Sequence, residues 1–379
     1  MKSNNIKILR AATVSDSVDF FREVMVKMRE RGYEMVALSS PGKWLTELKK
    51  NDGFRIVEVP MERHISIKND IKSLIRLIGV FRREKPHVVH SITPKAGLLC
   101  MVAAWLTRVP VRIHTFTGLV WPTATGIQRK ILMMTDWLTC SCATHVIPEG
   151  EGVKSDLQQY ITKKPMKVLG YGNVLGIDLQ RFNPDRIKGV TKDSCYFTFL
   201  FVGRIVGDKG INEMVWAFAK LHKEHPDTRL WLVGEYEPSL DPLQPETDAE
   251  ILSNDAIETK GALYGDNLIK AYMMTDCFVM PSYREGFPNS VLEAGAMGVP
   301  QIVTDINGSR EIVSNGENGL IVPSRDKEAL YRAMRVMYLD ACMRMKLSSK
   351  AREMIASRFE KNFVQQCQID FYDEILKTK

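Results

Sequence analysis

Short apolar runs that alternate with helical segments constrain this chain more than any other feature. The first run is IKILRAA (6–12), and a helical stretch over residues 17–31 separates it from YEMVALSS (33–40). HVVHSI (87–92) and VRIHTF (111–116) continue the pattern. Apolar runs of this length, each followed by a helix, are typical of strands that are buried on both faces of a parallel sheet.

The same pattern starts again in the second half of the chain. A turn-rich stretch, RFNPDRIKG (181–189), separates the two series of runs. The later runs are FTFLFVGRI (197–205), TRLWLVGE (228–235), CFVMPS (277–282) and QIVTD (301–305). A length of 379 residues is also more than one core usually organises. We therefore predict an α/β chain of two Rossmann-like domains, residues 1–185 and 190–360, whose parallel sheets face a central cleft.

Ligands of such sheets bind at the carboxyl ends of the strands, so the residues that follow each strand are the first candidates for a site. The first strand ends in AATVSDS without a G-x-G-x-x-G pattern, which argues against a dinucleotide cofactor there. The first strand of the second half ends in FVGRIVGDKG (201–210), where Arg204 and Lys209 precede a helix. Two cations beside a helix N-terminus suit a diphosphate, although either residue alone would also fit an ordinary surface charge.

A pair of carboxylates flanks the next such turn. In EGFPNSVLE, Glu285 follows the strand and Glu293 lies in the helix that begins at Pro288, because proline suits a first helical turn. We expect the backbone N–H groups of Gly286, Phe287 and Asn289 to face oxygens of a sugar or a phosphate. Carboxylates accept hydrogen bonds from hydroxyls, so the two glutamates suit a sugar and a ribose diol. The alternative is that both are surface charges.

Several classes of protein fit the sequence poorly. The seven cysteines form no C-x-x-C pair, so neither a disulfide framework nor a zinc site is indicated, and a reducing cytoplasm fits best. We find no signal peptide, and the longest apolar helical stretch (96–107) is too short to span a bilayer. The basic residues are not interleaved with aromatic residues in the way that a nucleic-acid binder requires.

Charge is distributed unevenly along the chain. Residues 1–185 carry 28 Lys and Arg against 17 Asp and Glu, whereas the remaining residues carry 24 against 28. A basic half suits an anionic partner such as membrane headgroups or a diphosphate, and the alternative is a solvated surface without a partner.

The complete set of motifs resembles the retaining glycosyltransferases of family 4, which have the GT-B fold. The resemblance is carried by FVGRIVGDKG (201–210), EGFPNSVLE (285–293) and the run at 298–326, and in the first half by HVVHSITPKAGLL (87–99) and GIDLQRFNP (176–184). It covers nearly the whole chain and is strongest to the bacterial subgroup that extends lipid-linked glycans for capsule, O-antigen or protein glycosylation. It implies that the second domain holds a nucleotide-sugar, that the first holds the acceptor, and that a last helix (361–379) crosses back to the first domain.

The resemblance also implies a role for each matching residue. Arg204 and Lys209 would bind the donor diphosphate and stabilise the leaving group, Glu293 would bind the ribose, and Glu285 would contact the transferred sugar. The residues that would line the same pocket are Gly286, Phe287, Pro288 and Asn289. In the first domain the resemblance points to His114 as an active-site histidine, with His90 and Lys95 on the acceptor side.

We expect sugar transfer from a UDP-linked nucleotide-sugar to a polyprenyl-diphosphate-linked acceptor with retention of configuration. The chain lacks a D-x-D motif, and two cationic side chains can replace a metal ion, so we expect no cofactor and no metal. The alternatives are an inactive nucleotide-sugar-binding protein and a GT-B sugar epimerase.

Two features complete the set of expectations. The segment 65–85 is an amphipathic helix with flanking cations, and Trp121 lies near Arg129 and Lys130, so we expect docking at the anionic inner membrane surface. The apolar face of 65–85 would otherwise pack on the core of the protein. Many family members have a glycine-rich loop after the first strand, near the donor phosphates, whereas this chain has ATVSDSVDF (12–20), in which Ser15 and Ser17 are candidate hydrogen-bond donors. We also expect Ser15 on the acceptor side.

Overall fold

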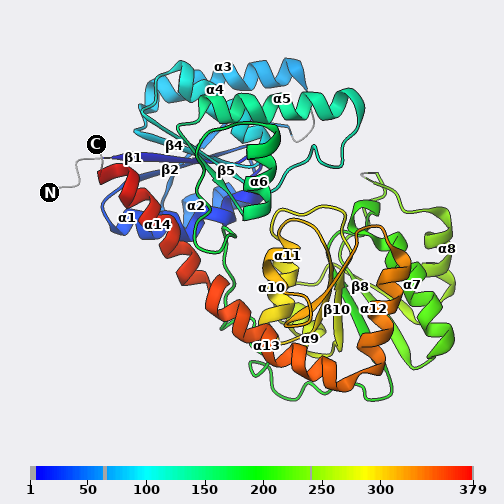
Figure 1. The fold of residues 1–379 in the computed structure, drawn as a ribbon. Coiled ribbons are helices and arrows are strands. Elements are labelled where there is room, and N and C mark those ends of the chain that lie inside the picture. The colour runs from blue at the N-terminus through cyan, green and yellow to red at the C-terminus, as the bar shows by residue number, and fades with distance from the viewer. Residues whose placement is uncertain (1–5, 63–65, 240, 378–379) are drawn as a thin grey trace. The chain divides into compact units, whose positions relative to one another are not determined.

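The structure is a computed structural model that describes residues 6–62, 66–239 and 241–377. The chain forms two compact units: the first runs to Gly176 and takes in the chain again from Asn362, and the second runs from Ile177 to Lys361. Within the described residues, each unit contains a six-stranded sheet with helices on both faces (Figure 1). These two sheets confirm the predicted α/β fold class.

The sheet of the first unit is parallel throughout, in the order β3-β2-β1-β4-β5-β6. Its strands are β1 (Lys7–Ala11), β2 (Glu34–Ser39), β3 (Arg55–Glu58), β4 (Val88–Ile92), β5 (Val111–Phe116) and β6 (His145–Pro148). The helices before the chain leaves this unit are η1 (Ser15–Phe21), α1 (Arg22–Glu30), α2 (Lys43–Asp52), α3 (Ile67–Glu84), α4 (Pro94–Leu106), α5 (Gly126–Cys142) and α6 (Glu151–Tyr160). All five residues of β4 are buried, as expected for a strand that is covered on both faces.

Two apolar cores, one on each face, hold the first sheet. One core joins the sheet to α3, α4 and α5, which pack side by side, and the other joins it to η1, α1, α2 and the last helix, α14 (Lys361–Lys377) (Figure 1). Tyr372 of α14 fixes this helix to the sheet, because its hydroxyl lies 3.0 Å from Arg10 Nη1 and 2.6 Å from His90 Nδ1. The last helix is therefore an integral part of the first unit.

The second unit repeats the strand order of the first. Its sheet is also parallel, in the order β12-β11-β10-β7-β8-β9. The strands are β7 (Phe197–Val202), β8 (Thr228–Val233), β9 (Ile257–Gly261), β10 (Cys277–Met280), β11 (Gln301–Thr304) and β12 (Gly319–Val322). The helices are η2 (Gly207–Lys209), α7 (Ile211–Glu224), α8 (Pro245–Ser253), α9 (Gly265–Met273), α10 (Asn289–Ala296), α11 (Ser309–Ile312), α12 (Lys327–Leu339) and α13 (Ala341–Phe359).

The chain divides after Gly176, earlier than the stretch 181–189 that the sequence indicated. The reason is local packing, since Ile177 and Phe182 are buried in the core of the second unit. The Ile177 N–H donates to the Phe359 carbonyl at 2.8 Å, and the Lys361 N–H donates to the Ile177 carbonyl at 3.0 Å. The residues just after Gly176 are thus paired with the end of α13 rather than forming a free linker.

In each sheet the strand order reverses at one place, between β1 and β4 in the first unit and between β7 and β10 in the second. Loops diverge there at the carboxyl ends of the strands, which leaves room for a ligand. These two reversal points are therefore the first candidates for a binding site.

The helix expected over 65–85 is α3, which begins at Ile67; Ile65 lies outside the described residues. The longest helix found, α13, has 19 residues, and none in the described part of the chain combines the length and apolar character needed to cross a bilayer.

Candidate active site

The predicted donor residues gather at the reversal point of the second sheet, between the ends of β7 and β10. After β7 the chain makes a short extension, in which the Ile205 N–H donates to the Glu235 carbonyl at 2.8 Å, and then enters η2. Gly210 follows with a φ of 72°, and a Cβ there would lie 2.1 Å from the Pro281 carbonyl oxygen. Only glycine allows this loop to approach the end of β10 so closely.

An ion pair joins the two loops. Lys209 Nζ lies 2.5 Å from Glu285 Oε1, and the side chains are only 15% and 14% exposed. Lys209, predicted to bind phosphate, and Glu285, predicted to contact the sugar, therefore neutralise each other in this structure. Arg204 is more open, at 45% exposed, and its Nη1 lies 3.7 Å from Glu237 Oε2.

The turn between Glu285 and α10 presents backbone rather than side chains. Phe287 is buried and its ring packs edge-on against Phe359, with centroids 5.3 Å apart. Among the described residues, no acceptor is found for the N–H of Gly286 or of Phe287. Gly308 packs against this turn from the other side, since a Cβ there would lie 2.1 Å from the Gly286 carbonyl oxygen.

Helix α10 begins one residue later than expected. Pro288 has a ψ of 111° and stands just before the helix, so it does not belong to the first turn, and Asn289 is the first helical residue. The cause is that the extended backbone of Pro288 lets its carbonyl accept from the Val291 N–H at 3.1 Å and close the first turn. Glu293 consequently lies in the second turn of α10.

Glu293 is held by a residue that the sequence analysis missed. The hydroxyl of Tyr272 on α9, which is fully buried, donates to Glu293 Oε2 at 2.9 Å. Burial raises the pKa of Glu293 to about 7, although the Tyr272 hydrogen bond opposes that shift. Burial likewise raises the pKa of Tyr272 far above its ordinary value, so its hydroxyl stays a donor. The sequence carries no motif for Tyr272; only its hydrogen bond to Glu293 reveals it.

Two of the residues predicted in the first unit, His114 and His90, are buried inside it. His114 lies inside β5 rather than at its end, and it is 1% exposed. Its Nδ1 forms a hydrogen bond with Ser91 Oγ at 2.9 Å. Burial lowers the pKa of His114 to about 3, so it is neutral. His90 is also buried, with Nε2 2.7 Å from Thr115 Oγ1, and its pKa falls well below the ordinary value through burial and the nearby charge of Arg10.

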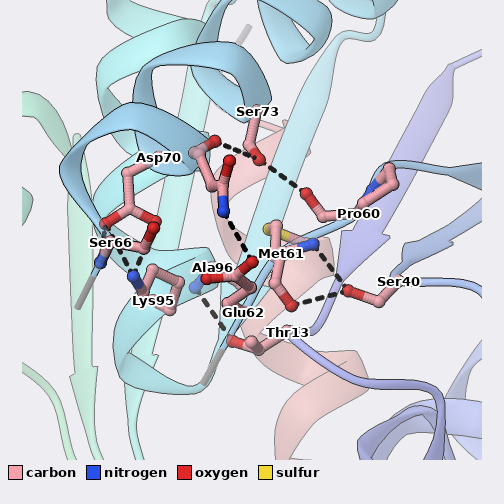
Figure 2. Close-up of polar contacts among 11 residues, drawn as sticks. Thr13, Ser40, Pro60, Met61, Glu62, Ser66, Asp70, Ser73, Lys95 and Ala96 are labelled. Carbon is pink, nitrogen blue, oxygen red and sulfur yellow. Dashed lines mark hydrogen bonds and ion pairs between the residues drawn. The ribbon is translucent and has the colours of Figure 1, made fainter. Parts of the chain in front are cut away.

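The other two predicted residues lie at the reversal point of the first sheet. Lys95, in the first turn of α4, forms an ion pair with Asp70 of α3 at 2.6 Å (Figure 2). Ser15 is buried, and its hydroxyl lies 3.1 Å from Asp16 Oδ1. Both residues belong to the first unit, whereas the predicted donor residues belong to the second.

Threonines close this reversal point. Thr13 Oγ1 accepts from the Ala96 N–H at 3.1 Å and so caps α4 (Figure 2), and it lies 2.7 Å from Thr93 Oγ1. Thr93 has a φ of 74°, which is a strained conformation for a β-branched residue. The N-terminus of α4 is thus satisfied by the protein itself.

No metal site emerges from the described residues, since no cluster of three or more His, Cys, Asp or Glu side chains is found in that part of the chain. The charged groups at the second reversal point include Lys209 and Arg204 with the two glutamates. This set suits an anionic ligand that also carries hydroxyl groups.

Comparison with known proteins agrees with this fold. Residues 18–172 match the family described as "Glycosyl transferase 4-like domain" and residues 184–354 match "Glycosyl transferases group 1". The capsular polysaccharide biosynthesis glycosyltransferase CapM of Staphylococcus aureus is 32% identical over 98% of both chains. An Escherichia coli protein named UDP-Gal:alpha-D-GlcNAc-diphosphoundecaprenol alpha-1,3-galactosyltransferase is 29% identical over 82% of this chain and 81% of its own.

Solved structures agree as well. Anabaena HepE, solved in complex with UDP and glucose, superposes with a TM-score of 0.77 over 97% of this chain and 100% of its own, at 15% identity. The two family matches and the similarity to CapM show that the protein is a glycosyltransferase, and the solved structures show the GT-B fold. More narrowly, the chain belongs to glycosyltransferase family 4, in its bacterial branch for capsule and lipid-linked glycan synthesis.

Proposed function

We propose that the protein transfers a hexose or N-acetylhexosamine from a UDP-sugar to a polyprenyl-diphosphate-linked glycan, with retention of configuration. The observation that carries this proposal is the Lys209–Glu285 ion pair, at 2.5 Å, beside Arg204 at the carboxyl ends of β7 and β10. One cation for phosphate and one acid for hydroxyls stand in contact at the place where the fold admits a ligand.

The donor diphosphate would bind at the loop after β7. Lys209 and Arg204 supply positive charge, and the N–H groups of Gly286 and Phe287 supply further donors at the end of β10. When the bond between the sugar C1 and the phosphate oxygen breaks, negative charge develops on the diphosphate, and these groups are already in place to receive it. This arrangement gives the two cations the role that a divalent ion has in other glycosyltransferases, so we propose transfer without a metal.

The carboxylates would hold the two ends of the donor. Glu293, in the second turn of α10, would accept from the ribose hydroxyls, with Tyr272 keeping its carboxylate in one orientation. Glu285 would accept from hydroxyls of the transferred sugar once Lys209 turns to the phosphate. A UDP-linked donor is favoured because the related Escherichia coli protein is named for UDP-Gal.

The bond changes in the proposed transfer balance without a further reactant. The acceptor hydroxyl oxygen forms the new bond to C1 on the face from which the diphosphate leaves, and its proton passes to the departing diphosphate oxygen. The products are the extended acceptor and UDP. We propose no side-chain base, because His114 is enclosed by its own unit and its lowered pKa of about 3 reflects that burial.

The acceptor side would lie at a membrane. The helices α3, α4 and α5 expose apolar side chains, which we call the docking face: Ile67, Ile71 and Ile75 on α3, Trp105 and Leu106 on α4, and Ile127, Ile131, Met134, Trp137 and Leu138 on α5. Lys68, Lys72 and Arg76 on α3, with Arg129 and Lys130 on α5, are also exposed. An apolar face bordered by cations suits the surface of an anionic bilayer.

Two expectations about this surface change with the structure. The alternative in which the apolar side of α3 packs on the core is wrong for Ile67, Ile71 and Ile75, which are 74%, 53% and 64% exposed. Trp121, in contrast, is 2% exposed and lies in the core, under the guanidinium of Arg129, so it does not belong to the docking face. Its place on the surface is taken by Trp137, which the sequence analysis did not single out.

The test is a donor panel with a synthetic polyprenyl-diphosphate-linked sugar as acceptor. UDP-glucose, UDP-galactose, UDP-GlcNAc, UDP-GalNAc and a GDP-sugar would be compared by release of nucleoside diphosphate, with and without EDTA. We expect release with one or more UDP-sugars, only when acceptor is present, and no loss in EDTA. Binding of UDP without any release would favour the inactive binding protein, and an inverted anomer in the product would remove the retaining mechanism.

A further inference from the structure

A second ion pair stands beside the first and joins the same two loops. Lys209 Nζ lies 2.5 Å from Glu285 Oε1, and Arg284 Nη2 lies 2.9 Å from Asp208 Oδ2. Each loop therefore contributes two consecutive charged residues, and the order of charges is reversed between them. Lys209 and Glu285 have roles that the sequence predicts, whereas Asp208 and Arg284 have none.

Asp208 is also the point at which the backbone of both loops is fastened. The Tyr283 N–H donates to the Asp208 carbonyl at 2.8 Å. The Asp208 N–H donates to Asp241 Oδ2 at 2.6 Å, and the neighbouring Gly207 N–H donates to the Asp241 carbonyl at 3.1 Å. The loops after β7, β8 and β10 thus meet at one residue.

Tyr283 anchors this framework to a helix. Its hydroxyl lies 2.7 Å from Glu213 Oε1 on α7, and the guanidinium of Arg325 lies over its ring, 4.3 Å from the centroid. The Arg284–Asp208 pair is therefore attached on both sides to elements that pack in the core. Among the residues that the structure describes, no side chain from outside these loops is found to support the Lys209–Glu285 pair in the same way.

The two pairs differ in how readily they can separate. Asp208 Oδ1 is buried and finds no hydrogen-bond partner among the described residues, so Arg284 is the main compensation for that carboxylate. Although Arg284 and Asp208 are 35% and 21% exposed, removing Arg284 would leave this buried oxygen in a carboxylate without its cation, which is costly and favours a pair that stays closed. Lys209 and Glu285, by contrast, are the residues to which a diphosphate and a sugar can offer equivalent partners.

We propose that Asp208 and Arg284 are positioning residues, whose ion pair holds the two loops together while the Lys209–Glu285 pair opens to receive the donor. This inference rests on the proposed function of Lys209 and Glu285. On binding, Lys209 exchanges the Glu285 carboxylate for a phosphate oxygen, and Glu285 turns to the sugar hydroxyls. The Arg284–Asp208 pair keeps both side chains within reach of the ligand throughout.

The test measures UDP affinity by calorimetry in the full chain for Arg284→Gln, Asp208→Asn and the double variant. We expect each single variant to lose about tenfold in affinity and the double variant to lose no more than the worse single one, because both remove the same contact. Arg284→Lys should restore most of the loss, since it retains the charge. Arg335→Gln is the matched control, because Arg335 forms a 3.5 Å ion pair with Glu224 elsewhere in the same unit, and it should bind UDP as the wild type does.

A merely structural role would reduce the amount of folded protein but not the dissociation constant of the folded fraction, so thermal unfolding is recorded in parallel. The inference is overturned if Arg284→Gln binds UDP as tightly as the wild type, or if the two single losses multiply in the double variant. If Lys209→Ala loses UDP binding while Arg284→Gln does not, this inference fails and the proposed function stands. A wild-type chain that neither binds UDP nor releases it from any donor removes the proposed function itself.

Discussion

The two units share one strand order but treat the point where it reverses in opposite ways. In the first unit the loops after β1 and β4 are tied together by Thr13 and Thr93, and Lys95 is paired with Asp70 of α3. In the second unit the loops after β7 and β10 meet through Lys209 and Glu285, whose partners there are each other. The first reversal point satisfies its own helix N-terminus, and the second presents a cation–anion pair that a ligand can replace.

This difference indicates that the strand order fixes where a ligand site can form, and that the loop residues determine whether a ligand can bind there. The parallel sheet brings two loops together at the same edge in both units. A glycine at position 210 and the cations around it make one edge suitable for a diphosphate. Threonine hydroxyls in the corresponding place of the other unit remove the free donors that such a ligand needs.

The largest expected effect is the loss of activity on replacing Lys209, which we compare with replacing Lys95. Lys209→Ala should reduce transition-state stabilisation by about 2–4 kcal/mol, because it removes one preorganised donor to the leaving diphosphate. The measurement is kcat/KM from nucleoside-diphosphate release. Lys95→Ala is the comparison in the first unit and should leave UDP affinity unchanged. Wild-type turnover in Lys209→Ala, or an equal loss of UDP binding in Lys95→Ala, would break the comparison.

The next effect contrasts two glycines with similar backbone conformations. Gly210 and Gly53 have φ values of 72° and 66°, but a Cβ at 210 would lie 2.1 Å from the Pro281 oxygen, whereas at 53 nothing described lies within 4 Å. Gly53→Ala should cost about 1 kcal/mol of folding free energy, from the left-handed conformation alone. Gly210→Ala should cost more than about 2 kcal/mol and also weaken UDP binding, because it forces the two loops apart. Denaturant unfolding and calorimetry test both, and equal costs would show that the close approach is not needed.

The units should also respond to pH in opposite directions. The pKa of Glu293 rises from 4.5 to about 7 on folding, so the folded state binds its proton more tightly and the second unit loses stability as pH rises from 4.5 to 7. The pKa of His114 falls from 6.5 to about 3, so the first unit loses stability as pH falls from 6.5 toward 3.

Two variants measure these contributions. Glu293→Gln should remove the loss at higher pH and raise the free energy of unfolding at pH 8 by about 1–2 kcal/mol, while weakening UDP binding. His114→Gln should flatten the loss in acid. Unfolding curves recorded across this pH range for both variants decide the matter, and a Glu293→Gln variant with an unchanged pH profile would contradict the assignment.

The smallest expected effect concerns the docking face, which only the first unit carries. Replacing Met134 and Trp137 by serine should lower the fraction of protein that floats with phosphatidylglycerol vesicles by several-fold, and about 0.5 M salt should lower it further. Leu252→Ser is the control, because Leu252 is 86% exposed on α8 of the second unit. Flotation that is equal in all three proteins would remove the docking proposal.

Much of the fold, and the grouping of several candidate residues at one reversal point, could be predicted from the sequence, for identifiable reasons. Strands that are buried on both faces read as continuous apolar runs, so β1 and β4 were placed within one residue at each end, and β7 begins where predicted but ends three residues earlier. The strands β3, β6, β9 and β12 were missed: RIVE is half exposed, IETKG is largely polar, and β6 and β12 have only four residues each. Arg204, Lys209 and Glu285 were found because they follow strand ends in the chain.

Contacts between distant segments could not be predicted in this way. Tyr272 lies 21 residues from Glu293, and Arg284 lies 76 residues from Asp208. Neither pair leaves a periodic signal in the chain. The burial of His114 was missed for a related reason: Gly97 of α4 packs directly on its ring, where a Cβ would lie 2.3 Å from Cε1. A histidine in a strand looks the same in a sequence whether a helix covers it or a ligand does.

The position of α14 bears on how the protein is made. Residues 177–361 are continuous in the chain and contain the whole of the second core, so this half can complete its folding as soon as it has been synthesised. The amino-terminal half must wait, because Ile369 and Tyr372 belong to its core and follow the second unit in the chain. A nascent chain would then hold a finished second unit while Arg10 and His90 still lacked their partner, Tyr372, so the unit that is synthesised later would be the first to fold.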